Sequence, residues 1–183
     1  SVPNPKERIV ELLQERDDKY RRFPQVVTDE KKPKEIAKGL VEFINTNPKS
    51  LIVENPQKSY EYVVGAGLLP FIRQLTGTEG EAVIMTDEVV NALYGPNCTS
   101  TGQIIEIPSG RQNKSLITVQ SIYDQLVDRG FDRSGTIISL GGSVVGDIAG
   151  YVAATYMRGV NFVQCPTSLV AMVDTSVGGK TSI

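Results

Sequence analysis

The sequence predicts an α/β protein: a doubly wound, mostly parallel β-sheet preceded by a short helical segment. From residue 51 onward, short β-branched runs alternate with stretches of helical periodicity, and the runs are apolar on both faces, as in sheets that helices cover on both sides. The charge distribution sets the first part apart, because residues 1–45 carry 19 charged side chains and residues 136–183 carry four. We therefore predict a boundary near residue 48, with a helical segment at 1–48 and an α/β domain at 49–183.

The charged segment is predicted to form two helices. Asn4, Pro5 and Glu7 suit the N-cap, N1 and N3 positions of the first helix. Apolar residues at helical spacing give each helix one apolar face; they are Ile9, Leu12, Leu13, Tyr20 and Phe23 in the first helix and Ile36, Leu40, Phe43 and Ile44 in the second.

The elements of the α/β part follow in order. Strands are predicted at residues 51–53, 60–64, 82–86, 103–107, 136–140 and 161–165, and the first two form a hairpin. Helices are predicted at residues 68–75, 89–93 and 116–126, and Gly130 ends the last of these. A further helix follows the Gly-rich turn that begins at Gly141.

The composition excludes several classes of protein. The chain has no histidine, which rules out a Ser-His-Asp hydrolase, a Cys-His protease and a His-ligated zinc within these residues. A net charge of −2 argues against a nucleic-acid partner, and neither a long apolar run nor a secretory leader is present, which argues against a membrane partner. We expect a cytoplasmic protein whose cysteines, Cys98 and Cys165, stay reduced.

Polar and glycine residues follow four of the predicted strands. Ligands of such sheets bind beyond the carboxyl ends of the strands, so these residues are expected to share one edge. They are Asp87, Lys114 in the loop 108–114, Gly141 to Ser143, Thr167 and Ser168. A carboxylate, a lysine, a Gly-rich turn before a helix and two hydroxyls predict a nucleotide site of the Rossmann-like type.

Each of these residues also has a purely structural interpretation. Ser143 stands where the fingerprint G-x-G-x-x-G has its second glycine, so the turn can equally be a tight turn with a Ser N-cap. Asp87 can hold a ribose or cap the next helix, and Lys114 and Arg111 can neutralise phosphate or lie in a solvated loop. Arg158 can simply complement the C-terminus of a helix.

The end of the chain looks like a phosphate-binding loop at Gly179, Lys180 and Thr181. The loop motif needs a glycine where this chain has Asp174, so we reject a nucleoside triphosphatase. Asp174 and Lys180 lie in an otherwise uncharged stretch, where each needs a partner, and they either pair with each other or contact a polar ligand.

The run GTIISLGGSVVGDIAGYVAATYMRGVNFVQCPTSLVAMVDTSVGGKTSI, residues 135–183, resembles the signature region of 3-dehydroquinate synthase. The upstream runs IPSGRQNKS and VIMTDEVVNALYG resemble the nucleotide loop and first ribose strand of that family, so that the resemblance covers about residues 51–183. Three positions depart from the family pattern, because Val89 replaces an asparagine, Arg111 a glutamate and Ser143 a third glycine.

The resemblance implies a dehydroquinate synthase-like fold and a set of site residues. NAD contacts fall on Asp87, Lys114, Gly142, Asp147, Thr167 and Ser168, with Ser143 in the same turn. Substrate contacts fall on Arg158, Asp174 and Lys180, and the last two are the catalytic candidates.

The family reaction removes phosphate from 3-deoxy-D-arabino-heptulosonate 7-phosphate and closes a carbocycle, with NAD oxidising and later reducing one carbon. The family's zinc, or another divalent metal, is held by a glutamate and two histidines of a second, helical domain. The resemblance further implies a homodimer for the full-length protein. Because the chain has no histidine and ends soon after Lys180, we expect this fragment alone to lack turnover.

Residues 4–44 resemble a different enzyme, the C-terminal end of shikimate kinase, which implies a bifunctional fusion whose junction lies in this chain. Two alternatives to the synthase remain. One is an NAD-dependent dehydrogenase of the glycerol or alcohol type, which would accumulate NADH. The other is a non-catalytic junction module, which would not bind NAD.

Overall fold

The computed structural model describes residues 49–54, 59–78, 80–98, 102–179 and 181–183. The chain divides into two compact units, residues 1–66 and residues 67–183, and each is described by itself. The two helices predicted before residue 48 lie outside the described residues, and the predicted domain boundary stays a prediction.

In the first unit, the described residues form an antiparallel pair of strands. Strand β1 (Lys49–Val53) pairs with β2 (Tyr60–Val64), with Lys49 opposite Val64 and Val53 opposite Tyr60. The two strands of the predicted hairpin are therefore confirmed.

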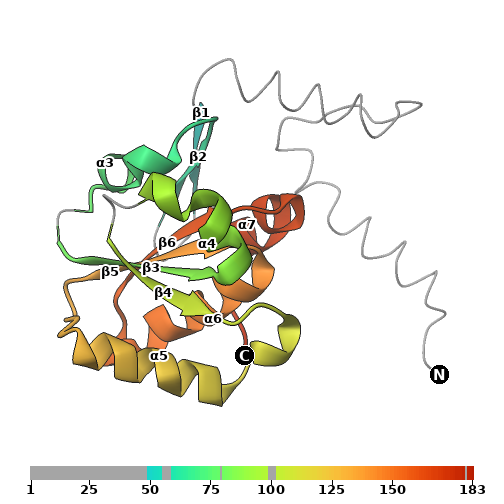
Figure 1. The fold of residues 1–183 in the computed structure, drawn as a ribbon. Coiled ribbons are helices and arrows are strands. Elements are labelled where there is room, and N and C mark those ends of the chain that lie inside the picture. Colours follow the sequence, from blue (N-terminus) through green and yellow to red (C-terminus); the bar gives the residue numbers. More distant parts are fainter. Residues whose placement is uncertain (1–48, 55–58, 79, 99–101, 180) are drawn as a thin grey trace, which may run out of the picture. The chain divides into compact units, whose positions relative to one another are not determined.

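The second unit contains a parallel four-stranded sheet in the order β4-β3-β5-β6 (Figure 1). Its strands are β3 (Ala82–Asp87), β4 (Gln103–Ile107), β5 (Thr136–Gly141) and β6 (Asn161–Pro166). All four strands were expected from their β-branched runs, and three of them extend one residue further at the carboxyl end. The predicted doubly wound α/β sheet is thus confirmed.

Both faces of the sheet are covered by helices (Figure 1). Along β3, Val83 and Met85 point into one apolar core while Ala82 and Ile84 point into the other, because successive side chains of a strand face opposite sides. Helices α5 (Leu116–Asp128) and α6 (Ser143–Thr155) close the first core. The short helices α3 (Ile72–Thr76) and α4 (Glu88–Tyr94) lie on the second. No helix of the described residues is long and apolar enough to cross a membrane.

Helix α5 follows its sequence signals closely. The Ser115 hydroxyl caps the first turn by accepting from the Thr118 amide at 3.3 Å. Buried residues at helical spacing face the sheet; they are Val119, Ile122 and Leu126. Gly130, at φ +69°, takes the left-handed conformation that ends the helix, and the Phe131 amide then donates to the Leu126 carbonyl at 3.0 Å.

The strand order creates a switch point between β3 and β5. The chain leaves β3 toward β4 on one side and leaves β5 toward β6 on the other, so the segments that follow these two neighbouring strands diverge. Ligands of open α/β sheets bind at such a divergence, beyond the carboxyl ends of the strands. Asp87 ends β3 and Gly141 ends β5, so Asp87 and the Gly-rich turn lie at this point.

Candidate functional site

The register of the sheet brings the ends of all four strands to one level. Asp87 pairs with Ile107 of β4, and Gly141 pairs with Pro166 of β6. Thr86 pairs with Leu140, so that Asp87 and Gly141 come next on adjacent strands. The residues that follow these ends, including Gly142 and Thr167, therefore share one edge of the sheet, as the sequence predicted.

The start of α6 is the most distinctive feature of this edge. Gly142 is the N-cap residue, Ser143 is the first residue of the helix, and no side chain caps the first turn. The predicted alternative of a Ser N-cap is therefore wrong, because Gly142 occupies the N-cap position and Ser143 already lies within the helix. An uncapped first turn presents backbone N–H groups and the positive end of a 13-residue helix, which together bind anions.

The two glycines before α6 serve different purposes. A Cβ added to Gly141 would lie 2.6 Å from Val145 Cβ, so helix packing requires glycine there. A Cβ added to Gly142 would meet, among the described residues, only Ser168 Oγ at 3.6 Å, an ordinary contact, and the φ of −76° suits any residue. The space at Gly142 is thus left open by the fold itself and would be filled by a side chain.

Asp87 acts as the N-cap of α4. Its Oδ1 accepts hydrogen bonds from the amides of Val89 at 3.0 Å and Val90 at 2.8 Å. The structural interpretation of this residue is therefore correct. It does not exclude the functional one, because Oδ2 makes no recorded hydrogen bond to a described residue and remains available to a hydroxyl donor.

Lys114 reaches across the edge to α6. Its Nζ lies 2.7 Å from Asp147 Oδ2 and donates to Ser182 Oγ at 2.7 Å. The Lys114 and Asp147 side chains are only 16% and 15% exposed, so Lys114 does not belong to a solvated loop, whereas Arg111 is exposed. The two residues predicted to contact a cofactor separately thus form an ion pair with each other.

Two hydroxyl residues follow β6 at the same edge. The Thr167 amide donates to the Gly141 carbonyl at 3.0 Å, which places Thr167 beside the Gly-rich turn. Ser168 Oγ accepts from the Ala171 amide at 3.3 Å and borders the open space at Gly142. Both residues therefore lie beside the Gly-rich turn that starts α6.

The structure places one predicted residue, Arg158, away from this edge. Arg158 precedes Asn161, which pairs with Thr136 at the start of β5, so Arg158 lies at the opposite edge of the sheet. Met157 and Arg158 there adopt left-handed φ values of +48° and +65°, a strained conformation for residues with side chains. Asp174 is exposed, and Lys180 lies outside the described residues.

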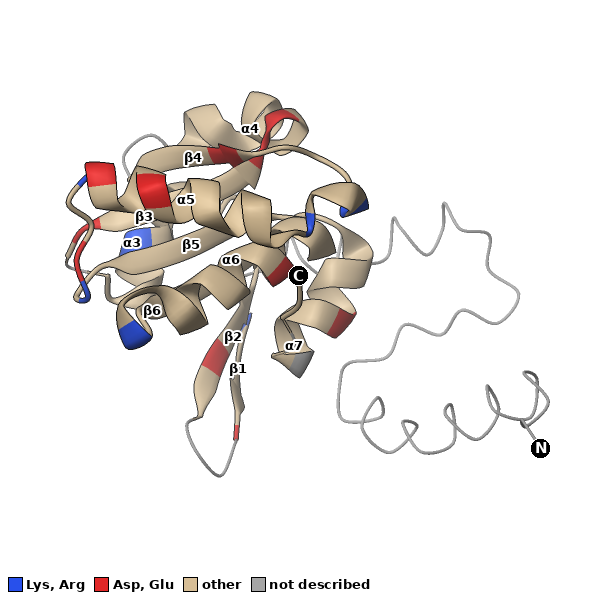
Figure 2. Ribbon diagram, turned by 90° about the horizontal axis from the view of Figure 1, so that it is seen from below, with Lys and Arg blue, Asp and Glu red and all other residues tan. Residues whose placement is uncertain are grey.

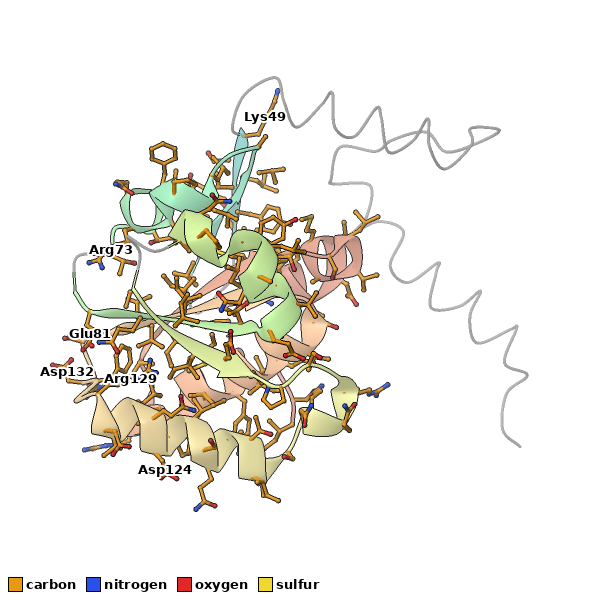
Figure 3. All side chains as sticks on the ribbon, in the orientation of Figure 1. Lys49, Arg73, Glu81, Asp124, Arg129 and Asp132 are labelled. Atoms are coloured by element: carbon orange, nitrogen blue, oxygen red, sulfur yellow. The ribbon has the colours of Figure 1, made fainter. Side chains whose placement is uncertain are left out.

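The opposite edge has a different character. Figure 3 shows Glu81, Arg129 and Asp132 gathered where β3 begins, with Arg73 nearby. Arg73 donates to the Gly80 carbonyl at 2.7 Å, and Arg129 Nη1 donates to the Ile104 carbonyl of β4 at 3.2 Å. Along α6, in contrast, Figure 2 shows very little charge; near its first turns the described contacts place the backbone amides and the ion pair of Lys114 with Asp147.

The sequence did not predict one residue of the edge, Glu88. Its Oε1 accepts from Ser109 Oγ at 2.6 Å and its Oε2 from the Ser109 amide at 3.0 Å. These bonds, the one from the serine hydroxyl above all, lower the pKa of the Glu88 carboxyl. No sequence signal could have found the pair, because its members are 21 residues apart and meet only once β3 and β4 are neighbours.

Together these groups can bind an anionic, hydroxyl-bearing ligand. They offer backbone amides, an ammonium group, a carboxylate oxygen and hydroxyls in the segments that follow the strands at one edge of the sheet. Within the described residues there is no group of three or more His, Cys, Asp or Glu that could hold a metal ion. The edge is therefore suited to binding a dinucleotide and holds no metal centre in the part of the chain that the structure describes.

Comparison with known proteins gives consistent results. Residues 104–183 match the model of the family described as 3-dehydroquinate synthase N-terminal. A 3-dehydroquinate synthase of Enterococcus faecalis is 44% identical over 144 residues, which are 73% of this chain and 40% of that protein. One from Geobacter metallireducens is 43% identical over 145 residues, with 74% and 40% covered. The chain thus spans about 40% of the length of these curated relatives.

One similar solved structure is 2-epi-5-epi-valiolone synthase of Streptomyces hygroscopicus, with NAD+ and Zn2+ bound. It is 26% identical with a TM-score of 0.50, and the match covers 55% of this chain and 30% of that one. A 2-deoxy-scyllo-inosose synthase is 18% identical with a TM-score of 0.64, over 70% and 39%. The latter likeness establishes the fold only.

Proposed function

We propose that this chain belongs to the 3-dehydroquinate synthase family and forms the NAD-binding part of such an enzyme. The family-model match over residues 104–183 and the 44% identity to a named synthase support the proposal. The observation that carries it is the uncapped first turn of α6 with an open Gly142, placed at the switch point of the sheet. A helix N-terminus in this position is where α/β proteins bind the pyrophosphate of a dinucleotide.

The residues of the edge fit NAD. The amides of Ser143 and its neighbours would hold the pyrophosphate, and Lys114 would balance its charge. Asp87 Oδ2 would accept a hydrogen bond from a ribose hydroxyl while Oδ1 stays with α4. Thr167 and Ser168 would supply hydroxyls on the other side of the turn. When bound, NAD supplies a reversible hydride acceptor.

We propose the family substrate, 3-deoxy-D-arabino-heptulosonate 7-phosphate, and its conversion to 3-dehydroquinate by phosphate elimination and cyclisation, a carbon–oxygen lyase reaction of the shikimate pathway. The assignments of Asp174 and Lys180 as catalytic residues and of Arg158 as a substrate contact rest on sequence alone. For Arg158 the fold raises a difficulty, because within one chain it lies at the edge opposite Gly142.

The metal of the family finds no ligand set here. The chain has no histidine, and its described residues contain no cluster of potential ligands. We therefore assign no step to a metal on these residues and expect the chain to bind NAD without turning over the substrate.

Calorimetric titration of NAD into the 183-residue chain tests the proposal, followed by an assay of phosphate release with NAD, zinc and the sugar-acid phosphate supplied. We expect saturable NAD binding and no turnover above background. Net accumulation of NADH with glycerol would instead identify a dehydrogenase, and absence of NAD binding would identify a non-catalytic module. Phosphate release well above background would refute the expected inactivity.

A second proposal concerns residues 4–44, whose sequence is similar to the end of shikimate kinase. We propose that they are the last part of a kinase domain fused to the synthase. These residues lie outside the described part of the chain, so sequencing the parent gene upstream of residue 1 is the test. A homodimer and a cytoplasmic location stay predictions from the sequence.

A further inference from the structure

The loop after β4 is fastened to the end of β3 by one side chain. Glu88, the first residue of α4, receives both hydrogen bonds that Ser109 can donate, from its amide at 3.0 Å and from its hydroxyl at 2.6 Å. The capping bonds of Asp87 fix the start of α4, so the Glu88 carboxylate projects from a defined position. Because both donors point at the carboxylate, they favour the ionised form of Glu88.

Ser109 in turn organises the rest of the loop. Its carbonyl accepts from Asn113 Nδ2 at 2.7 Å and from Gln112 Nε2 at 3.3 Å. Gly110, at φ +102°, turns the chain, and its carbonyl accepts from the Asn113 amide at 3.1 Å. The short helical turn that these bonds close delivers Lys114, whose own amide donates to the Arg111 carbonyl at 3.2 Å.

A continuous path of contacts therefore runs from Glu88 to the first turns of α6. It passes through Ser109, the turn at residues 110–113 and Lys114, and it ends at Asp147. Within this path, Lys114 is the cation closest to the uncapped amides of α6. Its side chain is long and flexible, so other contacts must hold it if the charge is to stay at one position.

We propose that Glu88 is a positioning residue for NAD binding: it anchors the 109–114 loop and thereby holds the Lys114 ammonium beside the first turn of α6. The inference rests on the proposed function, since NAD is the ligand whose charge Lys114 would balance. Glu88 itself touches neither Lys114 nor the open space at Gly142, so its effect on binding is transmitted through the loop.

The test compares Glu88→Ala and Glu88→Gln with a matched control, Glu106→Ala. Glu106 Oε1 accepts a hydrogen bond from Asn91 Nδ2, which joins β4 to α4 without involving the 109–114 loop. Glu106 and Glu88 are both exposed, so the two substitutions remove carboxylates in similar surroundings. Glutamine can accept from the Ser109 amide and donate to its hydroxyl, so Glu88→Gln retains both contacts that alanine loses.

Two readouts are needed, made on the 183-residue chain. The first is amide hydrogen exchange of Ser109, Asn113 and Lys114 without NAD, and the second is the NAD dissociation constant. For Glu88→Ala we expect faster exchange at all three amides and about five- to tenfold weaker binding, the effect of losing two exposed hydrogen bonds. We expect Glu88→Gln to stay within about threefold of wild type and Glu106→Ala within about twofold.

Transmission through Lys114 is tested by a double-mutant cycle. On a Lys114→Met background, Glu88→Ala should weaken NAD binding by less than about twofold, because the cation it positions is gone. Faster exchange confined to Ser109, unchanged affinity in Glu88→Ala, or fully additive effects in the cycle would each overturn the inference. Failure of the wild-type chain to bind NAD would count against the proposed function, while faster exchange at all three amides in Glu88→Ala would still support the anchoring of the loop.

Discussion

The Lys114 ammonium lies 2.7 Å from the Asp147 carboxylate, and this ion pair joins the loop after β4 to the second turn of α6. Both side chains are largely shielded from solvent. Among the described contacts, Lys114 is the only cation paired with a residue of α6. The relationship gives the two residues different expected roles: Lys114 would act on the cofactor, and Asp147 would orient Lys114.

Replacing either partner should weaken NAD binding to a different degree. For Lys114→Met we expect about tenfold weaker binding, because one charge-assisted contact is lost, and for Asp147→Ala about threefold, because the ammonium remains but is no longer held. The free energy of unfolding should fall by about 1–3 kcal/mol in both variants, because each leaves a largely shielded charge without its partner. Calorimetry and urea denaturation measure these effects; equal affinity in wild type and Asp147→Ala would remove Asp147 from the site.

The neighbouring glycines allow a sharp test of the open space. Gly142→Ala should fold normally, since among the described residues its Cβ would meet only Ser168 Oγ at 3.6 Å, but the methyl group would occupy the space proposed for the pyrophosphate. We expect at least about tenfold weaker NAD binding with little change in stability. Gly141→Ala should instead destabilise the fold by about 1–3 kcal/mol, because its Cβ would clash with Val145. Unchanged NAD affinity in Gly142→Ala would contradict the proposed position of the cofactor.

A buried hydroxyl offers a stability prediction independent of the cofactor. Ser139, in the middle of β5, is 1% exposed, and its Oγ has no hydrogen-bond partner among the described residues. Ser139→Ala should therefore raise the free energy of unfolding by about 1 kcal/mol. The control is Tyr156→Phe, which removes a buried hydroxyl that donates to the Phe131 carbonyl at 2.9 Å and should lower stability by about 1 kcal/mol. Destabilisation in Ser139→Ala would show that the hydroxyl has a partner.

The two cysteines should be unreactive in the folded chain. Burial, with a smaller contribution from the nearby Cys98, raises the pKa of Cys165 to about 12, and burial also raises the pKa of Cys98. Since the thiolate is the reactive form, iodoacetamide at about pH 8 should modify neither thiol until the protein is unfolded in guanidinium chloride. Mass spectrometry counts the modified sites, and rapid labelling of the native chain would contradict the raised pKa values of the two thiols.

Two serine-bound carboxylates should contribute to acid sensitivity. Ser109 lowers the pKa of Glu88 and Ser134 lowers that of Asp132, chiefly through their hydroxyl groups. A depressed folded pKa means that this stabilisation is complete above the unfolded values of 4.5 and 3.8 and is lost as the pH falls through the folded values. Urea midpoints measured from pH 6 downward should therefore decline less steeply in the double variant Ser109→Ala/Ser134→Ala than in wild type; parallel curves would disprove the linkage.

Much of the sheet and of its functional edge was predictable. Runs such as residues 82–86 and 136–140 are short, β-branched and apolar on both faces, which is typical of parallel strands covered on both sides. Gly130 marked the end of α5, and the parallel arrangement alone placed Asp87, Gly142 and Thr167 at the same edge. The residues that follow each strand could then be grouped without knowledge of the strand order.

The sequence by itself thus determined the kinds of element, their order along the chain and which polar groups share an edge, because these follow from local periodicity and from strand direction. The tertiary structure decided which strands are neighbours, and with it the pairing of Lys114 with Asp147, the bond from Ser109 to Glu88 and the distant position of Arg158. It also separated Gly141, which packing requires, from Gly142, which packing leaves open. Contacts of this kind depend on distances between segments far apart in the chain, and such distances exist only after the strands have paired.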